Sequence, residues 1–147
     1  MSSSVITELE KKGRYYTAPS GNSMKPMLYN KENVVEIERA VHPLRKYDLS
    51  LHFWEDGTRV LHRIVKVCDG CYVIRGDNCF YSQTVPLNRV IGVGKQFYRK
   101  GKWISVTDWK YRLYVAVWCG LYPVRKCLFA VRQKVKKCLG IERTSNG

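Results

Sequence analysis

Apolar and polar residues alternate along several short stretches in the middle of the chain. The alternation runs through residues 33–38, 48–54 and 59–67, and returns at 72–75, 89–98 and 102–106. A period of two places successive side chains on opposite faces of a strand. Short turn sequences such as 55–57 and 69–70 separate these stretches, and no helical pattern lies between them. The pattern predicts a mainly β fold, a small antiparallel barrel or sandwich.

Helical spacing replaces this alternation near the start of the chain. Residues 3–12 place Val5, Ile6 and Leu9 on one face, and the pattern stops at Gly13. Residues 14–19 then read as an extended segment. We therefore expect an N-terminal helix and lead-in strand over residues 1–19, followed by a β domain over residues 20–106.

The remaining segment, 107–147, reads as a basic amphipathic helical tail. Asp108 is a suitable N-cap, Pro123 breaks or kinks the helical spacing, and Gly140 ends it. After Pro123 one helical face is apolar. That face carries Val124, Cys127, Leu128, Val131, Val135 and Leu139.

The charge of the chain favours anionic partners. The net charge is +14, from 26 Lys and Arg against 12 Asp and Glu. Residues 108–140 carry half of this excess. Two interpretations remain open for the tail: an interfacial helix on an anionic membrane surface, or a helix packed on the β domain with a solvated basic face. We expect no specific nucleic-acid partner.

Two absences indicate the compartment. The N-terminus lacks the apolar core of a signal peptide, and the longest uncharged apolar run, 113–124, is shorter than a membrane span. We therefore expect a cytoplasmic location, or peripheral attachment to the inner face of the membrane. Among the six cysteines, Cys68 and Cys71 form a single C-x-x-C pair without a second pair at zinc spacing. We expect reduced thiols, a turn between strands at this pair, and neither metal nor cofactor.

Three segments carry residues with catalytic potential. Residues 21–27 read Gly-Asn-Ser-Met-Lys-Pro-Met, in which a glycine and a proline flank Ser23 and favour a stiff turn. His62 lies within the expected strand 59–67 among apolar residues, where partial desolvation keeps an imidazole neutral. Residues 76–78 read Gly-Asp-Asn. Taken singly, the serine segment and the Gly-Asp-Asn segment are more typical of turns, and His62 is more typical of a structural histidine, than of a catalytic site.

In this order and spacing, the three segments resemble the core motifs of the S24/S26 serine peptidases, the superfamily of LexA and signal peptidases. The similarity extends over about residues 20–93 and includes residues 46–48 and 90–93. The resemblance implies the small β domain of that superfamily, a polypeptide substrate, Ser23 as nucleophile and the backbone N–H of Ser23 as an oxyanion donor. His62 lies where most bacterial members carry a lysine base. A histidine there is similar to the endoplasmic-reticulum and SipW type of signal peptidase.

The resemblance leaves the third catalytic group open. Asp77 matches the family's Gly-Asp motif and is the first candidate to orient His62, with Asp48 second and a Ser-His pair without an acid as the remaining option. Lys66 lies four residues from His62 along the strand, about 13 Å away. Two other functions remain as alternatives: a non-catalytic basic module that binds membrane or nucleic acid, and LexA-like self-cleavage. The second is disfavoured because only 22 residues precede Ser23.

Overall fold

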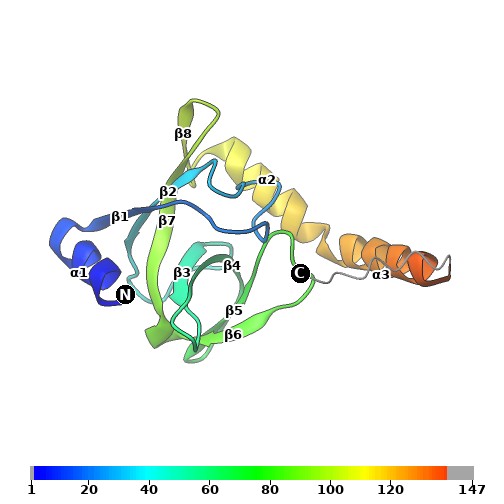
Figure 1. The fold of residues 1–147 in the computed structure, drawn as a ribbon, viewed down its shortest axis with the longest axis horizontal. Coiled ribbons are helices and arrows are strands. Elements are labelled where there is room, and N and C mark those ends of the chain that lie inside the picture. Colours follow the sequence, from blue (N-terminus) through cyan, green and yellow to red (C-terminus); the bar gives the residue numbers. More distant parts are fainter. Residues whose placement is uncertain (1, 139–147) are drawn as a thin grey trace.

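Strands dominate the computed structural model, which describes residues 2–138 (Figure 1). Eight of them form one antiparallel sheet in the order β1-β2-β7-β3-β4-β5-β6, with β8 paired to β7. The strands are β1 (Arg14–Thr17), β2 (Val34–Arg39), β3 (Leu49–Phe53), β4 (Arg59–Cys68), β5 (Cys71–Arg75), β6 (Gln83–Pro86), β7 (Val90–Arg99) and β8 (Lys102–Ser105). The helices are α1 (Ser2–Lys12), α2 (Trp109–Gly120) and α3 (Tyr122–Cys138), with a 3₁₀ turn at Leu87–Arg89. The prediction of a mainly β, antiparallel fold is confirmed.

The C-x-x-C pair lies at a hairpin turn, as the sequence predicts. Cys68 and Cys71 are directly opposite each other at the ends of β4 and β5. Gly70 has a φ of +70°, a conformation that glycine adopts without steric cost. Both thiols are free. The turn therefore accounts for the spacing of the two cysteines.

Two apolar clusters lie on the two faces of the sheet. The first combines Leu49 and Leu51 of β3 and Leu61 of β4 with residues of α1 and α2. The second combines Ile64 of β4 and Ile74 of β5 with residues of β6 and β7. Strands β5 and β7 are not neighbours in the sheet, so the sheet must curl to bring them into one cluster. No pairing joins the edge strands β1 and β6 within residues 2–138.

The helices form in the predicted segments, but the break between α2 and α3 lies two residues earlier than predicted. In α1, Val5 and Leu9 are buried and Ile6 is exposed. Asp108 caps α2, because its carboxylate accepts a hydrogen bond from the N–H of Lys110 at 2.8 Å. The break between α2 and α3 falls at Leu121 rather than at Pro123. Proline is tolerated there because Pro123 lies in the first turn of α3. The predicted end at Gly140 and the apolar residue Leu139 lie outside the described residues.

Candidate active site

Ser23 lies on a turn between β1 and β2 that is fixed on both sides. The side chains of Met24 and Met27, immediately after it, are 2% and 3% exposed and belong to the first apolar cluster. Before it, Gly21 has a φ of +80°, and its N–H donates to the side chain of Asn30 at 3.2 Å. Ser23 itself is half-buried. The buried methionines therefore hold a partly exposed serine on a stiff segment.

The Gly-Asp-Asn segment lies directly against Ser23. The backbone N–H of Asn78 donates to the carbonyl oxygen of Ser23 at 2.7 Å, and the Asn78 side chain donates to the Asn22 carbonyl at 3.3 Å. A Cβ on Gly76 would lie 2.6 Å from the backbone carbonyl oxygen of Ser23 and 3.0 Å from the Ser23 Cβ. The structure thus brings together two of the three segments singled out in the sequence, and only glycine fits at their contact.

The backbone N–H of Ser23 is available as a donor. Within residues 2–138, no hydrogen bond uses this N–H or the Ser23 hydroxyl. A backbone donor beside a nucleophile is the arrangement that stabilises an oxyanion during acyl transfer. No hydrogen bond within the described residues therefore competes with the role inferred for this N–H.

His62 occupies the middle of β4 on the face opposite Arg63. Its carbonyl accepts from the Ser50 hydroxyl at 3.1 Å, and its side chain is nearly buried, with 5% of the residue exposed. Burial lowers the pKa of His62 to about 4, against the smaller opposing effect of the Asp77 charge. The imidazole is therefore neutral at pH 7 and able to accept a proton. The structure contains no hydrogen bond between His62 and Ser23.

A second buried histidine lies beside His62. The rings of His52 and His62 are 5.9 Å apart between centroids. His52 is 1% exposed, and neither of its ring nitrogens has a hydrogen-bond partner. Burial, and then the neighbouring His62, lower the pKa of His52 to about 4, against a smaller opposing effect of the Ser50 backbone. Both imidazoles are thus neutral in the folded protein near pH 7.

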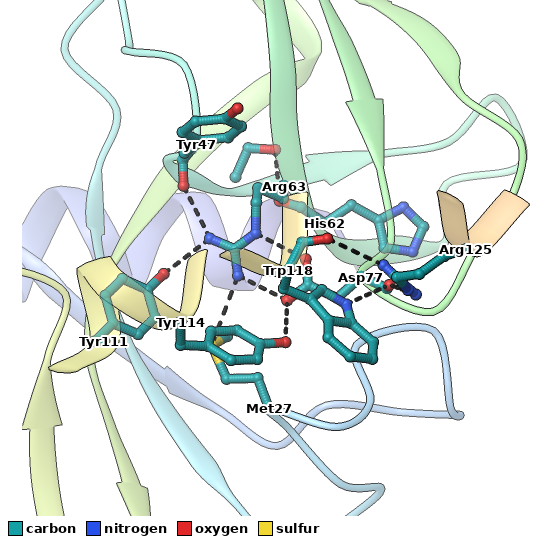
Figure 2. A network of polar contacts seen from close by, with 10 residues as sticks. Met27, Tyr47, His62, Arg63, Asp77, Tyr111, Tyr114, Trp118 and Arg125 are labelled. Carbon is teal, nitrogen blue, oxygen red and sulfur yellow. Dashed lines mark hydrogen bonds and ion pairs between the residues drawn. The ribbon is translucent and has the colours of Figure 1, made fainter. Parts of the chain in front are cut away.

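Asp77 pairs with Arg63 and not with His62 (Figure 2). The Arg63 Nε donates to Oδ1 at 2.7 Å and its Nη2 to Oδ2 at 2.8 Å. Tyr114 adds a third hydrogen bond, to Oδ2 at 3.2 Å. The side chains of Arg63 and Asp77 are 1% and 2% exposed. The expectation that Asp77 orients the imidazole therefore has no hydrogen bond to support it. The second candidate, Asp48, accepts instead from the backbone N–H of Arg45 at 2.8 Å.

Arg63 joins three parts of the fold. Besides Asp77, it donates to the Tyr47 carbonyl at 3.0 Å and to the Tyr111 hydroxyl of α2 at 2.9 Å. Its Nη2 also lies 3.6 Å from the sulfur of Met27, on the serine segment. Burial alone would lower the pKa of Arg63, but the hydrogen bonds and charge of Asp77 outweigh it and raise that pKa. Arg63 is a permanent cation that fixes β4, α2 and the Gly-Asp-Asn segment relative to Ser23.

Sequence reasoning overlooked Arg63, although a signal was present. Alternation along β4 places Arg63 on the same face as Leu61, which faces the first apolar cluster. A charged residue on a buried face requires an opposite charge. Asp77, two residues beyond the paired strand β5, is such a charge. The strand pattern therefore shows that Arg63 needs a partner, and the fold shows that the partner is Asp77.

The C-terminal helices attach to the Gly-Asp-Asn segment (Figure 2). The indole N–H of Trp118 and the Nη2 of Arg125 both donate to the Asp77 carbonyl, at 2.9 and 2.8 Å. Tyr122 donates to the Phe80 carbonyl at 3.0 Å, and Phe129 stacks on the Phe80 ring with centroids 4.3 Å apart. One face of α2 and of the first turns of α3 is thus packed on the β domain, as one of the two interpretations of the tail requires.

The described residues offer no obvious metal centre. Among residues 2–138, no three His, Cys, Asp or Glu side chains lie close enough to share an ion.

Two lysines are the other candidates for the base of Ser23. Lys25, two residues after Ser23, has its Nζ 5.2 Å from the centre of the Tyr29 ring. Lys66 is exposed at the far end of β4. His62 is therefore the base candidate that lies in a buried position.

Comparisons with known proteins add no independent support for a family. No protein-family model matches the sequence, and no curated protein matches it. The resemblance to the S24/S26 peptidases consequently depends on the three sequence segments alone.

Proposed function

We propose that this chain is a serine peptidase of the S24/S26 type, whose substrate is a polypeptide and whose fold is the small β domain of that superfamily. The observation that carries the proposal is the contact between Ser23 and the Gly-Asp-Asn segment, in which Asn78 donates to the Ser23 carbonyl at 2.7 Å. Two segments separated by more than 50 residues meet there without room for a side chain at Gly76. A surface turn has no need of such close support, whereas a nucleophile does.

The proposed reaction proceeds through an acyl-enzyme. Ser23 Oγ bonds to the carbonyl carbon of the scissile peptide while its proton passes to His62, and the Ser23 N–H stabilises the oxyanion. His62 then donates that proton to the leaving amine as the C–N bond breaks. Water hydrolyses the ester on Ser23 with His62 again as base. At pH 7 the imidazole of His62 is in the neutral form that can accept a proton, and its pKa of about 4 makes it a weaker base than an ordinary imidazole.

We assign Asp77 a positioning role in this reaction. Its carboxylate is occupied by Arg63 and Tyr114, so the proposed catalytic unit is a Ser-His pair without a third acid. Asp77 acts through Arg63, which holds the Gly-Asp-Asn segment against the serine turn. The structure contains no hydrogen bond between Ser23 and His62, whose side chain lies on the face of β4 opposite Arg63, so the mechanism requires the two side chains to approach each other when the substrate binds.

A peptide-library screen tests the proposal. Leader-type peptides with small residues in extended segments are incubated with the wild-type protein, Ser23→Ala, His62→Ala and the control Ser20→Ala, and products are measured by mass spectrometry. Loss of the base or the nucleophile should lower cleavage by at least about 10²-fold. Ser20 is exposed on the same segment, and its substitution should leave the rate unchanged.

Two outcomes would reject the peptidase. One is cleavage at the wild-type rate by the variant Ser23→Ala, with its folding checked by circular dichroism. The other is an inert wild-type protein, which would favour the alternative of a non-catalytic basic binding module. Cleavage of the chain itself, without cleavage of added peptides, would instead favour LexA-like self-processing.

A further inference from the structure

An exposed apolar stripe runs along both C-terminal helices. Its members recur every three or four residues, so that they share one helical face on both sides of the break at Leu121. Each is between 48% and 64% exposed. The stripe consists of Leu113, Val117, Leu121, Val124, Leu128, Val131 and Val135.

The stripe is not the face that packs on the β domain. Tyr111 and Val115 of α2 are buried in the first apolar cluster, and Trp118, Arg125 and Phe129 contact the segment around Asp77 and Phe80. Those residues lie on the opposite side of the helices. Figure 1 shows α3 extending outward, past the sheet. The helices are thus already anchored by one face, and their second apolar face remains uncovered.

The charge around the stripe indicates what covers it. The segment 109–138 contains eight Lys and Arg and no Asp or Glu. With 100° between successive helical residues, Arg132 and Lys134 flank Val131 on its two sides, and both are exposed. A partner that covers the stripe must therefore offer an apolar region to the stripe and negative charge to the lysines and arginines beside it. A second copy of the chain would bring its own cations beside the stripe, such as Arg132 and Lys134, to the contact, which disfavours self-association.

We propose that the stripe docks the protein on the surface of an anionic lipid bilayer, with the helices lying in the interface. Apolar side chains would enter the boundary between headgroups and acyl chains, and flanking lysines and arginines would contact lipid phosphates. Within residues 2–138, no single helix is long and apolar enough to cross a membrane, although α2 and α3 together, bent by 51°, meet the criteria of length and composition. The inference does not depend on the proposed peptidase activity.

Docking through this face would leave the contacts to Asp77 and Phe80 intact. The same two helices would then hold the Gly-Asp-Asn segment with one face and the lipid surface with the other. The candidate active site would be held close to the membrane in a fixed orientation.

Vesicle co-sedimentation of the full chain tests the proposal. Vesicles of phosphatidylcholine with phosphatidylglycerol are compared with vesicles of phosphatidylcholine alone. The variants are Leu128→Glu and Leu128→Ser on the stripe, and the control is Val41→Glu, a residue 80% exposed between β2 and β3. Leu128→Glu and Val41→Glu change the net charge equally, so a difference between them reports the stripe.

The wild-type chain should bind the anionic vesicles, bind the neutral ones at least about tenfold more weakly, and be released between about 0.05 and 0.5 M salt. Leu128→Ser should lose about tenfold in affinity, because it removes one buried apolar side chain, and Leu128→Glu should lose more. Val41→Glu should behave almost as the wild type.

Three results would overturn the proposal. The first is no binding of the wild-type chain to anionic vesicles. The second is equal binding by Leu128→Glu and Val41→Glu, which would leave only non-specific attraction of a basic protein. The third is a stable dimer that Leu128→Glu dissociates, which would assign the stripe to a second copy of the chain. Because Leu128 is 64% exposed, its variants should remain folded, and circular dichroism checks this.

Discussion

Gly76 is the residue at which the two halves of the candidate site meet. A Cβ there would lie 2.6 Å from the Ser23 carbonyl oxygen and 2.9 Å from the Cys79 sulfur. Backbone cannot yield as a flexible side chain can, so alanine at this position must displace the serine turn.

We therefore expect Gly76→Ala to lower kcat/KM for any peptide that the protein cleaves by at least about tenfold, because misplacement of a nucleophile by a fraction of an ångström is costly. The control is Gly120→Ala, since Gly120 ends α2 with no atom within 4 Å of an added Cβ. Equal activity per folded molecule in the two variants would show that the contact at Gly76 does not position Ser23.

His52 contributes a second test at the level of a single side chain. Its ring nitrogens are buried without hydrogen-bond partners, and an apolar side chain of similar size would remove that cost. His52→Leu should raise the free energy of unfolding at pH 7 by about 1–3 kcal/mol. Chemical denaturation measures the change.

His42→Leu is the matched control for His52→Leu. The His42 ring hydrogen-bonds the Tyr72 hydroxyl at 2.9 Å and the Val90 carbonyl at 3.2 Å. Its replacement should therefore destabilise the protein. Destabilisation by both substitutions to a similar extent would indicate that His52 is satisfied by groups such as bound water.

The contact between Arg63 and Asp77 acts between elements rather than within one. It ties β4 to the Gly-Asp-Asn segment, and through Tyr111 and Tyr114 it ties both to α2. Removal of one partner from a buried ion pair leaves the other charge uncompensated.

Asp77→Asn should consequently lower the free energy of unfolding by about 3–5 kcal/mol. Asp69→Asn, on the exposed turn between β4 and β5, should change it by less than about 0.5 kcal/mol. Urea denaturation of both variants gives the comparison. A variant Asp77→Asn with wild-type stability and strongly reduced turnover would instead return Asp77 to the role of an acid that orients His62.

At the level of elements, periodicity predicts most of the fold. Strands such as β2, β3 and β4 alternate clearly because one of their faces packs on an apolar cluster. β6 was overlooked because it has four residues, ends at Pro86 and buries only Val85. The break between α2 and α3 was placed two residues late, since proline is compatible with a first helical turn.

The candidate site is less accessible to sequence reasoning than the strands. The three segments can be recognised by resemblance, but local periodicity does not state which strands are neighbours. The order β7-β3-β4-β5 places Arg63 beside Arg75 and lets the residues after β5 reach the serine turn. Because this strand order buries the side chains of Asp77 and Arg63 at the same place, the two form an ion pair.

For the whole molecule, the two buried imidazoles predict how stability depends on pH. The pKa values of His52 and His62 are lowered from 6.5 to about 4 in the folded protein. Between these values the unfolded chain binds more protons than the folded one, so stability falls as pH decreases from 6.5 toward 4. Each lowered pKa unit corresponds to about 1.4 kcal/mol, and the combined loss should reach several kcal/mol.

Denaturation curves at several pH values measure this dependence. Above pH 6.5 both contributions are fully present, and the free energy of unfolding should change little from this source. His52→Leu should reduce the slope below pH 6.5 by about half, because one of two titrating groups is removed. An unchanged slope in that variant would show that His52 is not the buried neutral group described above.

The central claim is that Ser23 forms a covalent acyl-enzyme with His62 as its base, and partition to hydroxylamine tests it most directly. When a cleaved peptide is turned over in the presence of hydroxylamine, an ester on Ser23 is intercepted and the N-terminal fragment is released as its hydroxamate. Mass spectrometry should detect this hydroxamate with the wild-type protein and find neither cleavage nor hydroxamate with Ser23→Ala. Cleavage that yields only the free acid at high hydroxylamine, or a hydroxamate that persists in Ser23→Ala, would contradict the account.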